Sequence, residues 1–495
     1  MRKVFWTLFV LLISTSASSQ QLALVNGTAI PVTGAQAIEN AVVLIDDGRI
    51  TNIGENLEVP SGYEVLDVRG KWITPGIIDT NVHLILTTIP EFFIKYEDRL
   101  TDIAIQSAQV GLKYGLTTMP DTWGPLPPLL EARDRINSGE FVGSRILVAG
   151  NIIGTGGPFS QSFMGGWPLN GLTVRYGGWV RPEIRQRIDA LWEDDVGPAM
   201  IAMTPEEAAL TLRKYIAKGV DFVKIGVSGH GLGAVEPLLF SPAVLEAMRK
   251  EVRAAGIPLT THTFTIESLR LAVQMEPDLL LHPNVMSPSW EYATDKQREA
   301  ITSLMAQIAT KGIYAGLMMV PEENKSRIYA EWDYREHTDT PSLNRIMDER
   351  QFTMAGVSHE KQVAGLKAWL DSGIKYTLAT DQGPDSTDLG PVAWGRLGRM
   401  HFGRMIGLQE AGASPMEVLV ASTRAGAEAY GLEKTLGTLE AGKIADMLVL
   451  DADPLLDIAN MRKINAVIKD GKIVDREALP TVKVLDYDPS LPWPF

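Results

Sequence analysis

The chain contains no cysteine among its 495 residues. Disulfide bonds are therefore excluded, and packing of the core has to provide the stability of the fold. The absence also restricts any metal site to nitrogen and oxygen ligands, because soft thiolate-type sites need cysteine. Histidine and carboxylate side chains are thus the groups to follow through the sequence.

Two other features are missing. No block of Lys and Arg residues occurs and the formal net charge is −14, so a polyphosphate partner such as nucleic acid is not expected. Beyond the first twenty residues no apolar run is long enough to cross a bilayer, so stable membrane insertion is not expected either. With 45% hydrophobic and 21% charged residues, the chain has the composition of an ordinary globular protein. Its composition leaves open whether it is a monomer or a homo-oligomer.

The beginning of the chain has the pattern of a secretory signal peptide. A positive start at Arg2-Lys3 precedes an apolar run over residues 4–13 and small residues up to Ser19. The apolar run is too short to span a bilayer comfortably, which disfavours the alternative of a membrane anchor. We therefore expect residues 1–19 to be a Sec-type signal peptide and the mature protein to be periplasmic or secreted.

Both ends of the remaining chain read as short strands and turns. An apolar run at residues 41–45 precedes a turn with Gly48 in the position that needs positive φ, which is typical of a hairpin. Similar strands return at residues 444–450. The simplest arrangement pairs the two ends, so we predict a small β-sandwich domain formed by residues 20–75 and 431–495.

The middle of the chain, residues 76–430, alternates strand-like runs with helical patterns, such as the helix expected from Ser241-Pro242 to Gly256. Eight such strands favour a parallel (β/α)8 TIM-like barrel over an open sheet. Two insertions, at about 151–200 and 318–357, are long enough to serve as lids or binding walls. The strand-like runs are residues 77–79, 116–118, 145–148, 222–225, 258–261, 279–281, 313–315 and 376–379.

Polar side chains lie at or near the ends of several of these runs. In chain order they are Asn81, His83, Lys224, His262, His282 and Asp381. Side chains at successive strand ends of one barrel converge at its mouth. Taken alone, His83 would more often be structural, but histidines that end two consecutive strands lie side by side and favour metal ligation. The order of these residues therefore predicts a hydrolytic metal site.

Two members of this set have a specific chemical meaning. Lys224 lies inside an apolar run, where an ammonium is costly to bury, so it must reach solvent, pair with a carboxylate or lose its charge. Reaction with carbon dioxide is one way to lose the charge, and the resulting carbamate can bridge two metal ions. Asp381 follows a strand and is either a helix cap or, beside a metal-bound water, a general base.

With these residues in place, the chain resembles the amidohydrolase superfamily, and in particular the imidazolonepropionase-like branch that includes the Xaa-Pro dipeptidases (prolidases). The similarity covers nearly the whole mature chain. It implies a metal-dependent hydrolase of C–N bonds, often with two zinc ions. The stretches that carry it are residues 73–80, 115–118, 219–224, 379–381 and 436–446.

The resemblance also implies roles for individual residues. His83 is similar to the second histidine of the family's His-x-His pair and would hold the more buried metal together with Asp381, which would also orient the bridging hydroxide. Lys224 resembles the carboxylated lysine that bridges the metals. His262 and His282 would hold the more exposed metal.

The chain departs from the family pattern at two places. Asn81 stands where the family has its first histidine, and its amide oxygen is a weaker zinc ligand than imidazole. The resemblance thus implies one or two Zn²⁺ ions, or other divalent metals, with the buried site weakened. Pro158 stands where relatives commonly have a histidine. The preceding residues 154–157 lack the Lys-Ser/Thr of a phosphate loop and are interpreted as a flexible loop.

We therefore expect an exported, metal-dependent amidohydrolase that cleaves the C–N bond of a small-molecule substrate, such as a dipeptide or an N-acyl amino acid, by metal-activated water. Asp381 would take the proton from water and pass it to the leaving nitrogen. His230, six residues beyond Lys224, is a candidate for contact with the substrate, and its alternative is a plain loop histidine. Tyr176 in the first insertion is a second candidate.

Three alternatives stay open to different degrees. A deaminase of the same superfamily is disfavoured, because deaminases usually lack the lysine at position 224 and have Glu where this chain has Thr265. A hydrolase of lactams, carbamates, esters or xenobiotic amides would share every ligand. A catalytically degenerate binding protein is the third alternative, because Asn81 replaces a histidine.

Overall fold

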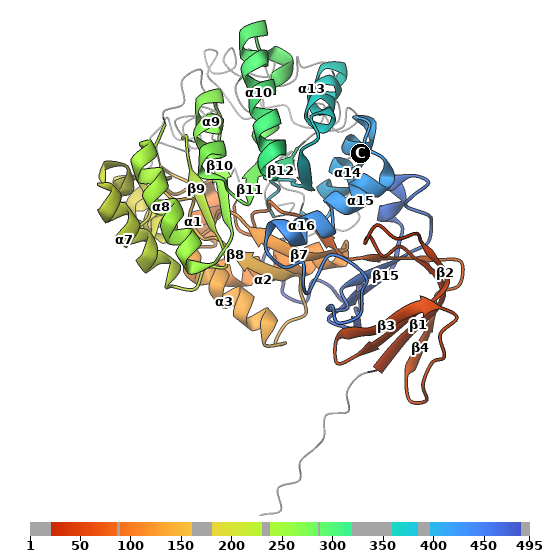
Figure 1. The fold of residues 1–495 in the computed structure, drawn as a ribbon. Coiled ribbons are helices and arrows are strands. Elements are labelled where there is room, and N and C mark those ends of the chain that lie inside the picture. The colour runs from red at the N-terminus through yellow and green to blue at the C-terminus, as the bar shows by residue number, and fades with distance from the viewer. Residues whose placement is uncertain are drawn as a thin grey trace, which may run out of the picture.

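The computed structural model describes residues 21–86, 90–160, 181–229, 238–285, 288–318, 359–384 and 397–486. The predicted signal peptide and most of the second predicted insertion lie outside these ranges. The described residues form an α/β barrel with a small β domain beside it (Figure 1). None of the helices in these ranges combines the length and the apolar character that a membrane span requires.

The barrel consists of eight parallel strands in two sheets, β6-β7-β8 and β9-β10-β11-β12-β13. The strands are β6 (Ile77–Ile78), β7 (Leu116–Asp121), β8 (Arg145–Val148), β9 (Val223–Gly226), β10 (Leu259–His262), β11 (Leu279–Leu281), β12 (Tyr314–Leu317) and β13 (Lys375–Leu378). Parallel bridges join the two sheets at both seams, between Ile153 and Ile225 and between Val82 and Gln382. The eight strands therefore close on themselves, which confirms the predicted fold class.

The sequence explains why these strands lie in the interior. Strands β9 to β12 are buried at every residue, as expected for parallel strands that are covered on both faces. The helices next to them in the chain, among them α7 to α10, lie outside the strands (Figure 1). The described helices are α1 (Pro90–Lys95), α2 (Leu100–Lys113), α3 (Leu126–Asn137), α6 (Pro182–Glu193), α7 (Pro205–Ile216), α8 (Pro242–Ala255), α9 (Ile266–Met275), α10 (Asp295–Lys311), α13 (His359–Asp371), α14 (Met400–Glu410), α15 (Pro415–Ala421) and α16 (Arg424–Ala429).

Helix α8 shows how local signals set the bounds of a barrel helix. The Ser241 hydroxyl accepts a hydrogen bond from the backbone N–H of Val244, and Pro242 occupies the first helical position. Gly256 ends the helix in the left-handed conformation, with φ of 68°. The predicted helix from Ser241-Pro242 to Gly256 is confirmed.

The small domain combines strands from both ends of the chain in one eight-stranded sheet. The first part of β1 pairs with β4 and its last part with β5, so the sheet folds around an apolar core. Strand β5 pairs antiparallel with β14 and leads directly into barrel strand β6, which anchors the first strand of the barrel. The strands are β1 (Gln21–Ala29), β2 (Ile38–Asp46), β3 (Arg49–Glu55), β4 (Glu64–Asp67), β5 (Trp72–Pro75), β14 (Met447–Leu450), β15 (Ile464–Lys469) and β16 (Lys472–Ile473).

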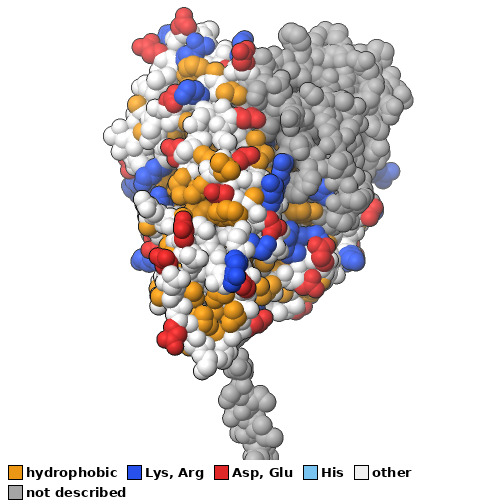
Figure 2. Space-filling view, turned by 90° about the vertical axis from the view of Figure 1, so that its right-hand side faces the viewer, with side chains coloured by type: hydrophobic (Ala, Val, Ile, Leu, Met, Phe, Trp, Pro, Cys, Tyr) orange, Lys and Arg blue, Asp and Glu red, His pale blue; other side chains and the backbone are white. Residues whose placement is uncertain are grey.

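The described part of the face seen in Figure 2 is of mixed character. Acidic and basic side chains are interspersed among apolar ones over the face seen in Figure 2. Such mixing is usual for a soluble globular surface.

The loop after strand β8 packs tightly between strand β9 and helix α6. Its Ile153 N–H donates to the Lys224 carbonyl at 2.9 Å, so the loop begins alongside the end of β9. A Cβ added to Gly157 would lie 2.7 Å from the Cα of Asp189 and 2.6 Å from its Oδ1. Residues 154–157 are buried in this packing, so the expectation of a flexible loop is wrong.

Gly157→Ala should destabilise the protein by about 1–3 kcal/mol, because the added methyl group meets backbone that cannot move aside. The measurement is thermal or denaturant unfolding. Gly54→Ala is the matched control, since its Cβ would meet only the flexible end of the Leu57 side chain, at 3.3 Å. Equal stability of the two variants would contradict the close packing.

The stability of this region should also depend on pH through Asp189. Burial raises the pKa of Asp189 to about 7, although its Oδ1 accepts the Phe159 N–H at 2.8 Å. The charged form is therefore disfavoured in the folded state, and stability is lost as pH rises from about 4 through about 7. Asp189→Asn keeps the acceptor without the charge and should raise the melting temperature by about 1–3 °C at pH 8, and by less at pH 5. A gain that is larger at pH 5 would contradict this account.

Candidate functional site

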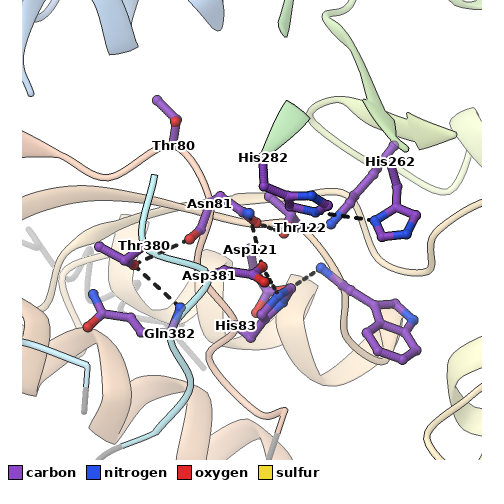
Figure 3. A network of polar contacts seen from close by, with 12 residues as sticks. Thr80, Asn81, His83, Asp121, Thr122, His262, His282, Thr380, Asp381 and Gln382 are labelled. Carbon is purple, nitrogen blue, oxygen red and sulfur yellow. Dashed lines mark hydrogen bonds and ion pairs between the residues drawn. The ribbon is translucent and has the colours of Figure 1, made fainter. Parts of the chain in front are cut away.

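The structure brings the side chains that end the barrel strands together at the barrel mouth (Figure 3). Lys224 lies in β9, His262 is the last residue of β10, and His282 directly follows β11. His83 and Asp381 come shortly after strands β6 and β13, which are neighbours at the seam. The other two predicted contacts, His230 and Tyr176, lie outside the described residues.

The two histidines on consecutive strands face each other through ring nitrogens. Nδ1 of His262 lies 3.2 Å from Nε2 of His282. With Zn–N bonds of about 2.0–2.1 Å, two ligand atoms of a tetrahedral zinc lie about 3.3 Å apart. Burial lowers the pKa of His282 to about 4, so its imidazole is neutral at neutral pH, which is the form that binds cations. The pair therefore has the spacing of metal ligands, and His282 is in the protonation state of one.

Asp381 is held as a carboxylate at the opposite side of the site. Its Oδ1 lies 2.9 Å from Nε2 of His83 and accepts a hydrogen bond from Nδ2 of Asn81, also at 2.9 Å. Burial raises the pKa of Asp381, but the bond to His83 and the neighbouring positive charges outweigh it and keep this pKa well below its usual range. The side chain keeps 24% exposure, so solvent and small molecules can reach it.

Lys224 cannot reach solvent, because it is only 1% exposed. Burial lowers its pKa to about 8, against the opposite effect of the Asp381 and Asp121 charges. A lysine with this pKa has an appreciable neutral fraction near neutral pH, and the neutral amine is the form that reacts with carbon dioxide. Of the three alternatives that the sequence left open for Lys224, contact with solvent is therefore excluded.

Asp79, which was not predicted from the sequence, ties strand β6 to the turn after β13. It accepts hydrogen bonds from the Thr380 backbone N–H at 3.1 Å, the Thr380 hydroxyl at 2.5 Å and the Gln382 amide at 3.1 Å. Buried Arg404 of helix α14 donates to the Thr380 carbonyl at 3.4 Å from the other side. The turn that carries Asp381 is thus held from two directions. The available signal was a carboxylate at the end of the first strand, two residues before Asn81.

Asp121 and Thr122, at the end of strand β7, were missed as well. Asp121 accepts the backbone N–H groups of Leu84 and Trp123, at 2.7 and 3.1 Å, and so fixes the segment that follows His83. Burial raises the pKa of Asp121 to about 6. The sequence predicted that strand β7 ends at residue 118, three residues too early. Asp121 and Thr122 were therefore not recognised as residues at the end of a strand.

The side chains at the strand ends are of the types that bind a divalent metal, although they do not form a complete coordination site. Among the described residues, no three His, Asp or Glu side chains stand close enough to hold a metal ion together. The donors form two pairs, His83 with Asp381 and His262 with His282. The charges of Asp381, Lys224 and His83 all contribute to the pKa shift of His282. The two pairs of donors are therefore close to each other. Imidazole nitrogens and a carboxylate make up the donor set, which is one that Zn²⁺ accepts.

Comparison with known proteins gives consistent results. A model of the Amidohydrolase family matches residues 72–474. An imidazolonepropionase from Agrobacterium fabrum is 23% identical over 450 residues, which cover 88% of each chain. The solved structure of a molinate hydrolase is 30% identical with a TM-score of 0.81 and covers 96% of this chain and 99% of that one. Phenylurea hydrolase B is also 30% identical with a TM-score of 0.81, over 95% of this chain and 100% of that one.

Asp79→Asn should release the turn that carries Asp381, because the new amide group would face hydrogen-bond donors that the carboxylate accepts. We expect activity to fall about 10–100-fold, the usual effect of losing a supporting hydrogen-bond partner at a metal site. Steady-state kinetics and thermal unfolding measure the effect. Asp134→Asn, at a side chain that is 66% exposed, controls for loss of charge alone. Unchanged activity in Asp79→Asn would show that the turn does not depend on this carboxylate.

Proposed function

We propose that this chain, which belongs to the amidohydrolase family and is a hydrolase of C–N bonds, works with a divalent metal ion at the barrel mouth. The observation that carries this proposal is the facing pair of ring nitrogens of His262 and His282, 3.2 Å apart. His83 and Asp381 supply a second pair of donors. The resemblance found in the sequence, the donor types and their burial all support it.

The residues suit one or two Zn²⁺ ions. His262 and His282 would hold one ion, His83 and Asp381 would contribute to a second, and Lys224 would join both as a carbamate. A bound metal supplies Lewis acidity, which polarises the substrate carbonyl and lowers the pKa of a water. The buried amine of Lys224 supports carboxylation, because burial favours its neutral form.

Asp381 is the group of this chain that moves the proton. It is ionised and partly exposed, so it can accept a proton from the attacking water. The same carboxyl group then donates that proton to the leaving nitrogen. His83 and Asn81 hold its Oδ1 from two sides, so the acceptor does not have to reorient during the reaction.

The substrate is best sought among ureas and carbamates. The two structures that match at 30% identity over almost the whole chain are named as hydrolases of molinate and of a phenylurea. An aromatic side chain beside one of the histidines supports a substrate with an apolar group. The centroid of the Phe264 ring lies 4.7 Å from that of the His262 ring. A urea or carbamate with an aryl or alkyl group on nitrogen therefore suits this site better than the dipeptide expected from the sequence.

The signal-peptide pattern of residues 1–19 supports a further part of the proposal, namely that the mature enzyme is exported. Its substrate would then be met outside the cytoplasm. The partner that we propose is this small molecule.

His262→Ala and His282→Ala should each remove the bound metal and lower kcat/KM by at least about 10³-fold, because each removes a ligand of the same ion. Metal content per chain is measured by elemental analysis. Activity is measured on phenylureas, carbamates, N-acyl amino acids and dipeptides, with added zinc and bicarbonate. His401→Gln is the control, since His401 is a buried histidine that belongs to neither ligand pair and whose Nε2 lies 3.1 Å from the Tyr114 carbonyl. A wild-type protein that binds no zinc and hydrolyses nothing in this panel would favour the binding-protein alternative.

A further inference from the structure

A continuous chain of hydrogen bonds crosses the site from Lys224 to Asp381. Nζ of Lys224 donates to the Thr122 hydroxyl at 3.2 Å, and this hydroxyl donates to Oδ1 of Asn81 at 2.5 Å. Nδ2 of Asn81 then donates to Oδ1 of Asp381 at 2.9 Å. Figure 3 shows Asn81 between Thr122 and Asp381, with dashed lines for the two contacts. The four residues lie in, or within three residues after, strands β9, β7, β6 and β13.

We propose that Thr122 and Asn81 form a relay that positions Asp381, and that Asn81 serves as a positioning residue and not as a metal ligand. This inference rests on the proposed function, because the position of Asp381 matters for the reaction through the proton that it accepts. It assigns a role to Thr122, and it changes the role expected for Asn81 from the sequence.

The two ends of the relay determine its direction. A carboxylate only accepts hydrogen bonds, so Asn81 must turn its amide nitrogen toward Asp381. The amino group of Lys224 donates to Thr122, so the Thr122 hydroxyl directs its own hydrogen to the next acceptor, Oδ1 of Asn81. A carboxylated Lys224 would keep an N–H on Nζ, and the direction would be the same. Both ends thus require the same orientation of the Asn81 amide.

This orientation does not suit a metal ligand. The amide group that faces the His83–Asp381 pair is the NH₂ end, which presents hydrogens to the place where a cation would lie. The oxygen, which is the only atom of Asn81 able to bind a metal, points to Thr122. Both polar atoms of the side chain are therefore engaged within the relay.

Asn81 also supports the backbone of Asp381. Asp381 has φ of 59°, in the left-handed region that L-residues rarely adopt. Its backbone N–H donates to the Asn81 carbonyl at 2.7 Å, while the Asn81 side chain donates to its carboxylate. One residue thus holds both the strained backbone and the side chain of Asp381, as a positioning role requires.

The first test removes the Thr122 hydroxyl. In Thr122→Val we expect kcat to fall about 10–100-fold with KM and zinc content nearly unchanged, because the relay breaks while every metal ligand remains. Thr122→Ser restores a hydroxyl and should recover kcat to within about threefold of wild type. Thr118→Val is the matched control: Thr118 is equally buried on strand β7, and its hydroxyl has no hydrogen-bond partner among the described residues. Wild-type kcat in Thr122→Val, or loss of zinc from it, would overturn the relay.

The second test separates a relay from a ligand with Asn81→Asp. This change keeps the shape and the acceptor for Thr122 but places a second carboxylate oxygen against Asp381. The relay predicts that kcat falls about 10–100-fold, that the zinc dissociation constant changes less than about threefold, and that the absorption spectrum of the cobalt-substituted protein is retained. A ligand role predicts at least about tenfold tighter zinc binding and an altered cobalt spectrum, because a charged oxygen binds better than an amide.

Failure of the relay and failure of the proposed function give different results. An active, zinc-containing wild type with insensitive Thr122 and Asn81 variants would overturn the relay alone. A wild type without zinc and without activity on the whole substrate panel would overturn the proposed function and, with it, the role of the relay in catalysis.

Discussion

The burial of the Lys224 amino group is the constraint on which the other contacts of the site depend. Burial disfavours its ammonium form, and the carboxylates of Asp381 and Asp121 are the charges that act against this effect. Within the described site, its one side-chain hydrogen bond goes to the Thr122 hydroxyl, which in turn donates a hydrogen bond to Asn81. The positive and negative groups at the barrel mouth therefore stabilise one another electrostatically. A change in the charge or position of one group changes the environment of the others.

The closed barrel makes this balance possible. Strands β6 and β13 are about three hundred positions apart in the chain, yet they meet at one seam, where Asp79 holds the turn that carries Asp381. The small β domain contributes to this arrangement because β5 runs directly into β6. The family match and the 30% identity to two solved hydrolases fit a site built in this way on the strand ends.

The sequence predicted the barrel and the convergence of Lys224, His262 and His282, because in a parallel barrel the place of a residue at a strand end already determines where it lies. It did not predict Thr122 or Asp79. Their roles depend on contacts between strands that are distant in the chain and on side-chain orientation, neither of which follows from spacing. The interpretation of residues 154–157 failed for a related reason, since close packing against helix α6 and flexibility both select glycine.

The central claim is that the donors at these strand ends bind a cation. Anomalous diffraction at the zinc absorption edge, from crystals of the zinc-loaded protein, tests it most directly. The account predicts an anomalous peak about 2.0–2.1 Å from both Nδ1 of His262 and Nε2 of His282. A zinc-loaded crystal without a peak between these two nitrogens, or with zinc bound only elsewhere on the protein, would contradict it.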